Sequence, residues 1–166
     1  MTVRQNDTTA LAATGDQTDK VYIQGDGNFI ISGTWAGTVT FLKRRALWKS
    51  IGVQDGGDAQ AAFTDSTLTK ATGTAIVADE LIGMWISNDD TGSVGPITDN
   101  TATVVTATQI GGTDQTWDDD ETASLWQVVG AYTTNQNLTF NEADNRTDFM
   151  AVFVKSSGTA HIEISQ

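Results

Sequence analysis

Few side chains in this sequence are suited to catalysis. Cysteine is absent and His161 is the only histidine, which excludes disulfides, thiolate metal sites and any chemistry that needs two imidazoles. The G-x-S-x-G, P-loop and H-E-x-x-H motifs of common enzymes are also missing. A carboxylate pair for glycoside hydrolysis stays open, because the separation that such a pair needs is spatial. We therefore predict a protein that binds without catalysing a reaction and that uses no cofactor.

Acidic residues gather in segments that have the composition of loops. They are Asp89, Asp90, Asp99, Asp114 and the run 118–121. Carboxylate oxygens of this kind suit Ca²⁺, which takes about six to eight oxygen ligands. No stretch follows the order of an EF-hand loop. We expect solvated loops and no bound metal, with Ca²⁺ binding as the alternative.

Basic residues are scarce but clustered. Four of the nine stand close together, and they are Lys43, Arg44, Arg45 and Lys49. Blocks of like charge usually remain in water, so a solvated segment is one interpretation. The other is a contact with an acidic surface on a second copy or on another protein, because opposite charges set the register of protein partners. These four residues are therefore interface candidates.

The overall charge limits the class of partner. The chain of 166 residues carries 21 acidic and nine basic residues, a formal net charge of −12. Nucleic acids and anionic membranes would repel such a protein. No apolar run approaches the roughly 18 residues that a membrane span needs, and the first residues do not resemble a signal peptide. We expect neither nucleic acid nor a membrane as a partner.

Short apolar stretches separated by Gly, Asp and Asn predict β-strands from Lys20 onward. Every second residue is a core candidate at Val39 and Phe41, and again at Ile162 and Ile164. This alternation is typical of half-buried strands. The run 148–154 is apolar at both parities, so either both of its faces are covered or its outer face meets a partner. The second interpretation adds two interface candidates, Phe149 and Phe153.

Composition along the chain predicts three parts. Residues 1–19 are polar, which is typical of an extended N-terminal arm that orders against neighbouring molecules. Residues 20–55 and 125–166 predict one discontinuous β-sandwich of Greek-key or jelly-roll type. Residues 56–124 carry strand pairs and loops of their own and predict an inserted β-module. We thus expect an all-β protein with very little helix.

Five tryptophans are many for a chain of this length. A Trp side chain offers on the order of 200 Å² of surface to bury, so core or interface positions are the main expectation. An exposed row of these rings would instead form a sugar-binding platform. The five residues are Trp35, Trp48, Trp85, Trp117 and Trp126.

Three stretches resemble structural proteins of tailed bacteriophages. YIQGDGNFIISGTWAGTVTFLKR at residues 22–44 and AVFVKSSGTAHIEISQ at residues 151–166 are similar to the beginning and the end of a compact phage β-domain. Residues 86–121, with DNTATVVT and GGTDQTWD, resemble a Thr-rich β-hairpin module that is appended to phage and other multidomain proteins. Together the three stretches cover about half of the chain.

The resemblance implies a non-enzymatic virion protein, assembled in the bacterial host cytoplasm. Its expected role is capsid decoration, as a cement protein that stabilises the head by binding neighbouring capsid subunits. The implied partners are the major capsid protein, other virion proteins and further copies of the chain itself. A tail, neck or fibre component is one alternative, and a carbohydrate-binding β-sandwich module is another.

Overall fold

β-Strands, turns and irregular segments make up the part of the chain that the structure describes. A computed structural model describes residues 6–49, 60–62, 76–118 and 121–166, and none of these residues is in a helix. The expectation of an all-β protein is confirmed. Accordingly, the described residues include no helix with the length and apolar character of a membrane span.

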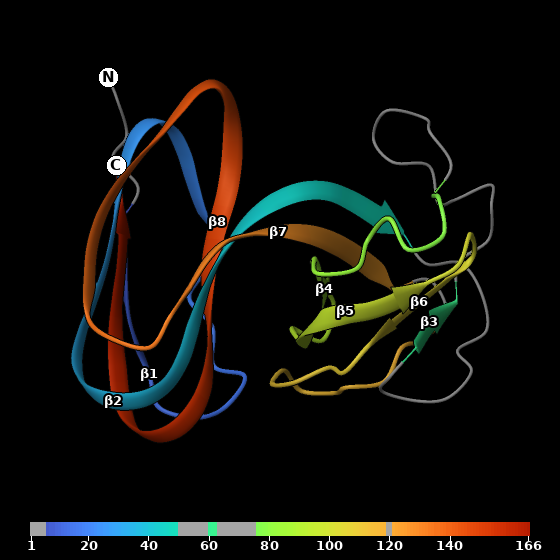
Figure 1. Ribbon diagram of the computed structural model, residues 1–166, viewed down its shortest axis with the longest axis horizontal. Coiled ribbons are helices and arrows are strands. Elements are labelled where there is room, and N and C mark those ends of the chain that lie inside the picture. The colour runs from blue at the N-terminus through green and yellow to red at the C-terminus, as the bar shows by residue number, and fades with distance from the viewer. Residues whose placement is uncertain (1–5, 50–59, 63–75, 119–120) are drawn as a thin grey trace. The chain divides into compact units, whose positions relative to one another are not determined.

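The chain divides into two compact units, and both are drawn in Figure 1. The terminal unit consists of residues 1–44 and 128–166, and the central unit consists of residues 45–127. The sequence had placed these divisions near residues 55 and 125, and it had set residues 1–19 apart. In the structure the N-terminal segment belongs to the terminal unit.

Two long strands, β2 (Val21–Lys49) and β8 (Gln136–Ser165), form most of the terminal unit and curve back on themselves (Figure 1). Phe29 of β2 lies opposite both Leu138 and Ile164 of β8. Phe149 of β8 in turn lies opposite both Val21 and Lys43 of β2. Partner numbers on β8 fall as those on β2 rise, which is the register of antiparallel strands. Each long strand therefore pairs with two separate segments of the other. This mutual pairing makes the unit sandwich-like.

Alternating side chains of β2 and β8 fill the core of the terminal unit. The aromatic rings among them form a continuous cluster. Phe29 stacks on Phe41 with ring centroids 4.0 Å apart, and Phe41 lies 5.3 Å from Phe149. The buried apolar residues of this core are Leu11, Val21, Ile23, Phe29, Ile31, Val39, Phe41, Phe149, Ala151, Phe153, Ala160, Ile162 and Ile164.

The segment expected to be an extended arm that orders against neighbouring molecules instead pairs with β8 of the same chain. Strand β1 (Asn6–Leu11) pairs antiparallel with β8, and Leu11 is buried in the core. Farther along, the Gly15 and Thr18 amides donate to the carbonyls of Phe153 and Ala151 at 2.8 and 3.0 Å. Backbone hydrogen bonds satisfy this segment, so its polar side chains gave no sign of the pairing. Residues 1–5 lie outside the described part of the chain.

The central unit is a smaller antiparallel sheet. It contains β3 (Gln60–Ala62), β4 (Trp85–Asn88), β5 (Val94–Asn100), β6 (Val104–Ala107) and the first half of β7 (Thr122–Tyr132). Their order in the sheet is β7, β4, β5, β6, β3. Its apolar core is formed by Ile76, Leu81, Met84, Ile86, Ile97, Val105, Ala107, Trp117, Ala123 and Leu125.

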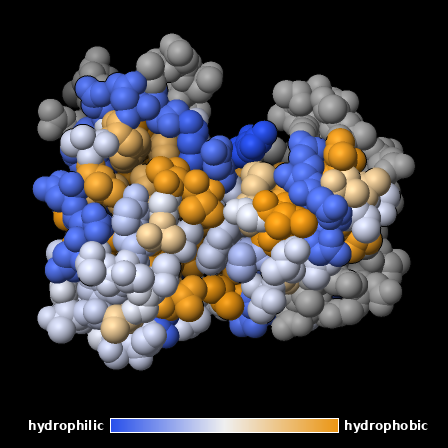
Figure 2. Space-filling view, viewed as in Figure 1, coloured by the Kyte–Doolittle hydropathy of each residue, from blue (hydrophilic) through white to orange (hydrophobic). Residues whose placement is uncertain are grey.

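Apolar residues also appear on the surface of both units, scattered among polar ones (Figure 2). The large hydrophobic residues that are exposed in the described segments are Val77, Ile82, Val129 and Val154. Isolated apolar residues of this kind are normal on protein surfaces. They do not by themselves mark a binding site.

Gly158 permits a sharp bend in β8. Its φ is +74°, and a Cβ atom there would collide with the Thr34 carbonyl oxygen on the paired strand. The bend therefore needs both the left-handed conformation and the missing side chain. Gly158 is the glycine of the Ser-Ser-Gly-Thr stretch at residues 156–159.

Gly158→Ala should lower the free energy of unfolding by more than about 2 kcal/mol, because Ala adds backbone strain and a collision. Gly25→Ala is the matched control, since Gly25 also has positive φ (+90°) but no other group lies within 4 Å of the place that its Cβ would occupy. The control should cost only about 1 kcal/mol. Urea unfolding of both variants measures the difference, and equal losses would contradict the steric argument.

Candidate functional site

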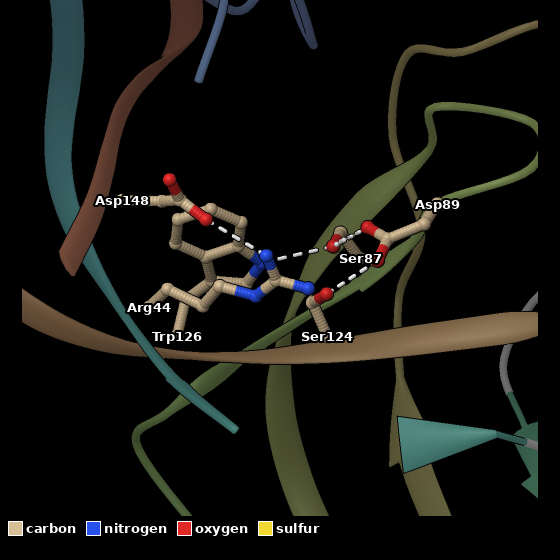
Figure 3. Close-up of polar contacts among 6 residues, drawn as sticks. All are labelled: Arg44, Ser87, Asp89, Ser124, Trp126 and Asp148. Carbon is tan, nitrogen blue, oxygen red and sulfur yellow. Dashed lines mark hydrogen bonds and ion pairs between the residues drawn. The ribbon is translucent and has the colours of Figure 1, made fainter. Parts of the chain in front are cut away.

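The first two residues of the basic cluster are engaged by carboxylates of the terminal unit. Lys43 Nζ lies 2.6 Å from both carboxylate oxygens of Glu142. Arg44 donates to Asp148 at 2.7 Å, as Figure 3 shows. All four side chains are partly exposed, so each pair contributes only about 0 to 1 kcal/mol. The positive charge of Lys43 and Arg44 is nevertheless balanced inside the unit.

Arg45 and Lys49 are the other two residues of the basic cluster. Arg45 is exposed, and the side chain of Lys49 lies outside the described part of the molecule. Because Lys43 and Arg44 already have partners at short distance, an acidic surface would have to displace Glu142 and Asp148 to reach them. The contact with an acidic partner stays a prediction, and among the described side chains only Arg45 is well placed for it.

Phe149 and Phe153 were predicted at an interface, and this prediction is wrong for the chain as it folds. Their exposed fractions are 1% and 0%. Phe149 packs on Phe41 and on Phe140, and Phe153 meets the Trp35 ring edge-on at 5.7 Å. The curvature of β2 and β8 encloses both rings in the core of the terminal unit. Neither ring offers surface to a partner.

Phe153→Asp should therefore unfold the terminal unit and should not produce a folded protein with altered oligomeric state. A charge in place of a buried ring costs about 4 kcal/mol or more. Val154→Asp is the matched control on the next residue, because Val154 is 40% exposed. Thermal melts should show a large loss for the first variant and a small one for the second. A folded Phe153→Asp protein with normal stability would contradict the core assignment.

A polar network joins strands β4 and β7 in the central unit (Figure 3). Ser87 and Ser124 donate their hydroxyl hydrogens to the two carboxylate oxygens of Asp89. Trp126 Nε1 donates to the Ser87 oxygen at 2.8 Å. Both serines and the Trp are buried, so these hydrogen bonds satisfy groups that water does not reach. The network therefore stabilises the turn at Asp89.

Asn88 links the loops on either side of this network. Its Oδ1 accepts from the amides of Asp90 and Thr91 at 3.0 and 3.2 Å. Its Nδ2 donates to the Glu121 carboxylate at 2.7 Å. The side chain is fully buried. Sequence reasoning missed this residue, although Asn ahead of an Asp-Asp-Thr-Gly turn is a recognised signal for side-chain capping.

Three of the acidic residues considered as Ca²⁺ ligands, Asp90, Asp114 and Glu121, accept hydrogen bonds from backbone amides, while Asp119 and Asp120 lie outside the described residues. Asp90 accepts from the Thr122 amide at 2.6 Å, and Glu121 accepts from the Asp118 amide at 2.6 Å. The amide and then the hydroxyl of Thr116 hold the pKa of Asp114 below its ordinary value. Within the described segments, no group of three or more acidic or histidine side chains is arranged to hold a metal ion.

The tryptophans do not form an exposed row in the described part of the chain. Trp85, Trp117 and Trp126 are buried. Trp35 is half-buried, and its Nε1 donates to the Asn135 side chain at 2.8 Å. The side chain of Trp48 lies outside the described residues. A sugar-binding platform built from several Trp rings thus loses its basis, and the core expectation holds for three of the five.

Charge is distributed very unevenly between the units. The central unit contains three basic and thirteen acidic residues, a net charge of −10, whereas the terminal unit contains six and eight, a net charge of −2. The two values account for the formal net charge of −12. The central unit is therefore the part of the chain that anionic partners avoid most strongly.

Asn88→Ala should lower the unfolding free energy by about 2 to 3 kcal/mol, because it removes the acceptor of two turn amides and one of the two donors to the Glu121 carboxylate. Gln115→Ala is the control, since Gln115 is exposed in a loop of the same unit. The control should change stability by less than about 0.5 kcal/mol. Chemical denaturation tests both variants, and an unchanged Asn88→Ala protein would show that the loops hold without this link.

Comparison with known proteins adds no relative to this picture. No protein-family model, no curated protein and no solved structure matches the chain. The functional interpretation consequently depends on the residues and on the way the strands bring them together.

Proposed function

We propose that this chain is a virion structural protein of a tailed bacteriophage, and that it decorates the capsid and stabilises the head by binding neighbouring capsid subunits. The observation that carries the proposal is a pairing. The two stretches that resemble the beginning and the end of a phage β-domain lie side by side in one sheet, with Ile31 opposite Ile162 and Trp35 opposite Gly158.

The details of this pairing suit the resemblance. The S-G-T-W-A-G stretch of β2 and the S-S-G-T stretch of β8 both contain glycines with positive φ, and these lie near each other in the register. The strands that follow, Val39–Phe41 and Ile162–Ile164, point their apolar residues into the shared core. The motifs therefore belong to one β-unit, although more than one hundred residues separate them along the chain.

The third stretch of resemblance falls in the other unit. Residues 86–121 include β5 and β6 and most of β4, all of which are strands of the central unit. This arrangement supports the idea of a β-module carried within a phage β-domain. Its net charge of −10 also makes nucleic acid inside the head an unsuitable partner for the central unit.

The mechanism is stabilisation by linkage. A protein that binds the assembled shell but not free subunits shifts assembly toward the shell by its binding free energy. At a concentration about 100 times the dissociation constant, each site contributes about 2.7 kcal/mol. Repetition of the same contact over many equivalent sites multiplies this effect, and no chemical step is needed.

The test is to locate the protein on purified particles. Gold-labelled antibodies against this chain should mark the heads at regular positions in electron micrographs. Particles produced without the gene should lose the label, and their heads should open at a lower temperature in a thermal-release assay. Label confined to the tail, neck or fibres would replace decoration with the alternative placement. Purified particles without the protein would overturn the virion assignment.

A further inference from the structure

The two most exposed large hydrophobic residues of the described chain lie on one loop of the central unit. This loop spans residues 76–84 and leads directly into β4. Val77 is 64% exposed and Ile82 is 50% exposed. Scattered apolar residues are normal on a surface, but two such residues on one short loop form a pair that a single partner can cover.

Buried residues of the same loop explain why these two side chains remain outside. Ile76, Leu81 and Met84 belong to the apolar core of the central unit. Val77 directly follows Ile76, and Ile82 directly follows Leu81. The core thus takes one residue of each adjacent pair and leaves the other in solvent. The exposure of Val77 and Ile82 is therefore a consequence of how the loop is anchored.

Asn100 holds the loop in one conformation. Its Nδ2 donates to the Val77 carbonyl, and its Oδ1 accepts from the Leu81 amide, both at 2.9 Å. Its backbone carbonyl accepts from the Asp79 amide, also at 2.9 Å. The Asn100 side chain is buried, so water competes little for these hydrogen bonds. A partner therefore meets a loop that is already ordered, which reduces the entropic cost of binding.

The backbone of Asp79 is unusual. Its φ is +65°, and among the described residues it is the only one other than glycine with a positive φ. Residues with a side chain rarely adopt this left-handed conformation, although Asp tolerates it better than most. The hydrogen bond from its amide to Asn100 fixes the conformation. Outliers of this kind cluster at functional sites, which supports a role for the loop beyond folding.

The surroundings of the loop are acidic. Residues 76–118 and 121–127 contain eight Asp or Glu residues and no Lys, Arg or His. Three of the eight are exposed in the loop or directly before Asn100, and they are Asp79, Glu80 and Asp99. A complementary surface must present apolar atoms to the two exposed hydrophobic side chains and positive charge to these carboxylates.

We propose that the 76–84 loop is the surface through which the central unit docks on a capsid subunit, and that the site on that subunit is an apolar depression flanked by Lys or Arg side chains. This inference rests on the proposed function and adds to it the chemistry of the contact. Its charge is opposite to that of the contact predicted for the basic cluster, in which Arg45 would meet an acidic surface. The two contacts use different residues and can be tested separately.

The experiment adds the purified full chain back to heads that were produced without its gene, and sedimentation measures the occupancy. Val77→Ser with Ile82→Ser should weaken binding about tenfold or more, because the apolar area of both side chains is no longer buried. Val129→Ser with Val154→Ser is the control, since these residues are the exposed large hydrophobics of the terminal unit. The control should bind like the parent protein. All four residues are exposed, so both variants should melt close to the parent temperature.

A second double variant tests the charge of the contact. Asp79→Asn with Asp99→Asn should weaken binding to the heads and make it less sensitive to salt, because two carboxylates no longer attract cationic side chains. Asn tolerates a positive φ at position 79, so the loop should keep its conformation. Asp114→Asn with Asp118→Asn is the control of equal net charge, since both residues are exposed in the same unit outside the loop. This control should retain the affinity and the salt dependence of the parent protein.

The outcomes separate this inference from the decoration proposal. A parent protein that does not bind the heads overturns the decoration proposal, and this inference with it. If the parent protein binds, unchanged affinity of the Val77 and Ile82 variant overturns the docking loop alone, and so does an equal loss in its control. Unchanged affinity and salt dependence of the Asp79 and Asp99 variant overturn the cationic flank of the partner site.

Discussion

The mutual pairing of β2 with β8 is the interaction on which the terminal unit depends. Residues near Phe29 lie between two arms of β8, and Phe149 lies between two arms of β2. The two strands can satisfy their backbone groups in this way only if each bends sharply, and the glycine corners allow the bends. The stacked rings of Phe29, Phe41 and Phe149 then fill the space that the bends enclose. The core of the terminal unit and the pairing of its N-terminal strand both follow from this arrangement.

A different balance of forces organises the central unit. Its strands β4 and β6 have four residues each, and the long segment 108–121 separates β6 from β7. Buried and partly buried polar side chains compensate for the short strands, because Asn88, Asp89 and Ser124 hold loops and strands by side-chain hydrogen bonds. Several carboxylates bind local backbone amides. Some of the carboxylates in this unit thus stabilise its own loops. The net negative charge of the unit disfavours anionic partners.

These contacts also limit how the protein can meet a partner. The residues that were most attractive as interface candidates are mostly used inside the chain, by ion pairs at Lys43 and Arg44 and by burial at Phe149 and Phe153. A capsid contact would therefore draw on exposed loops and on Arg45, with modest contributions from each residue. A weak contact is sufficient for a decorating protein when it is repeated, because the contributions of many equivalent sites add up.

Local patterns in the sequence determined the strand character of the chain. The alternation at Val39 and Phe41 and at Ile162 and Ile164 correctly predicted that these residues lie in a core. The reason is that every second side chain of a strand faces the same side of the sheet. Only the tertiary structure decided which faces are covered and which residues are partners. Glu142 and Asp148 stand about one hundred residues from the cations they pair with, and β1 is held by backbone groups that every sequence possesses. Local patterns record the preference of each segment, whereas these contacts depend on long-range pairing of strands that no local pattern encodes.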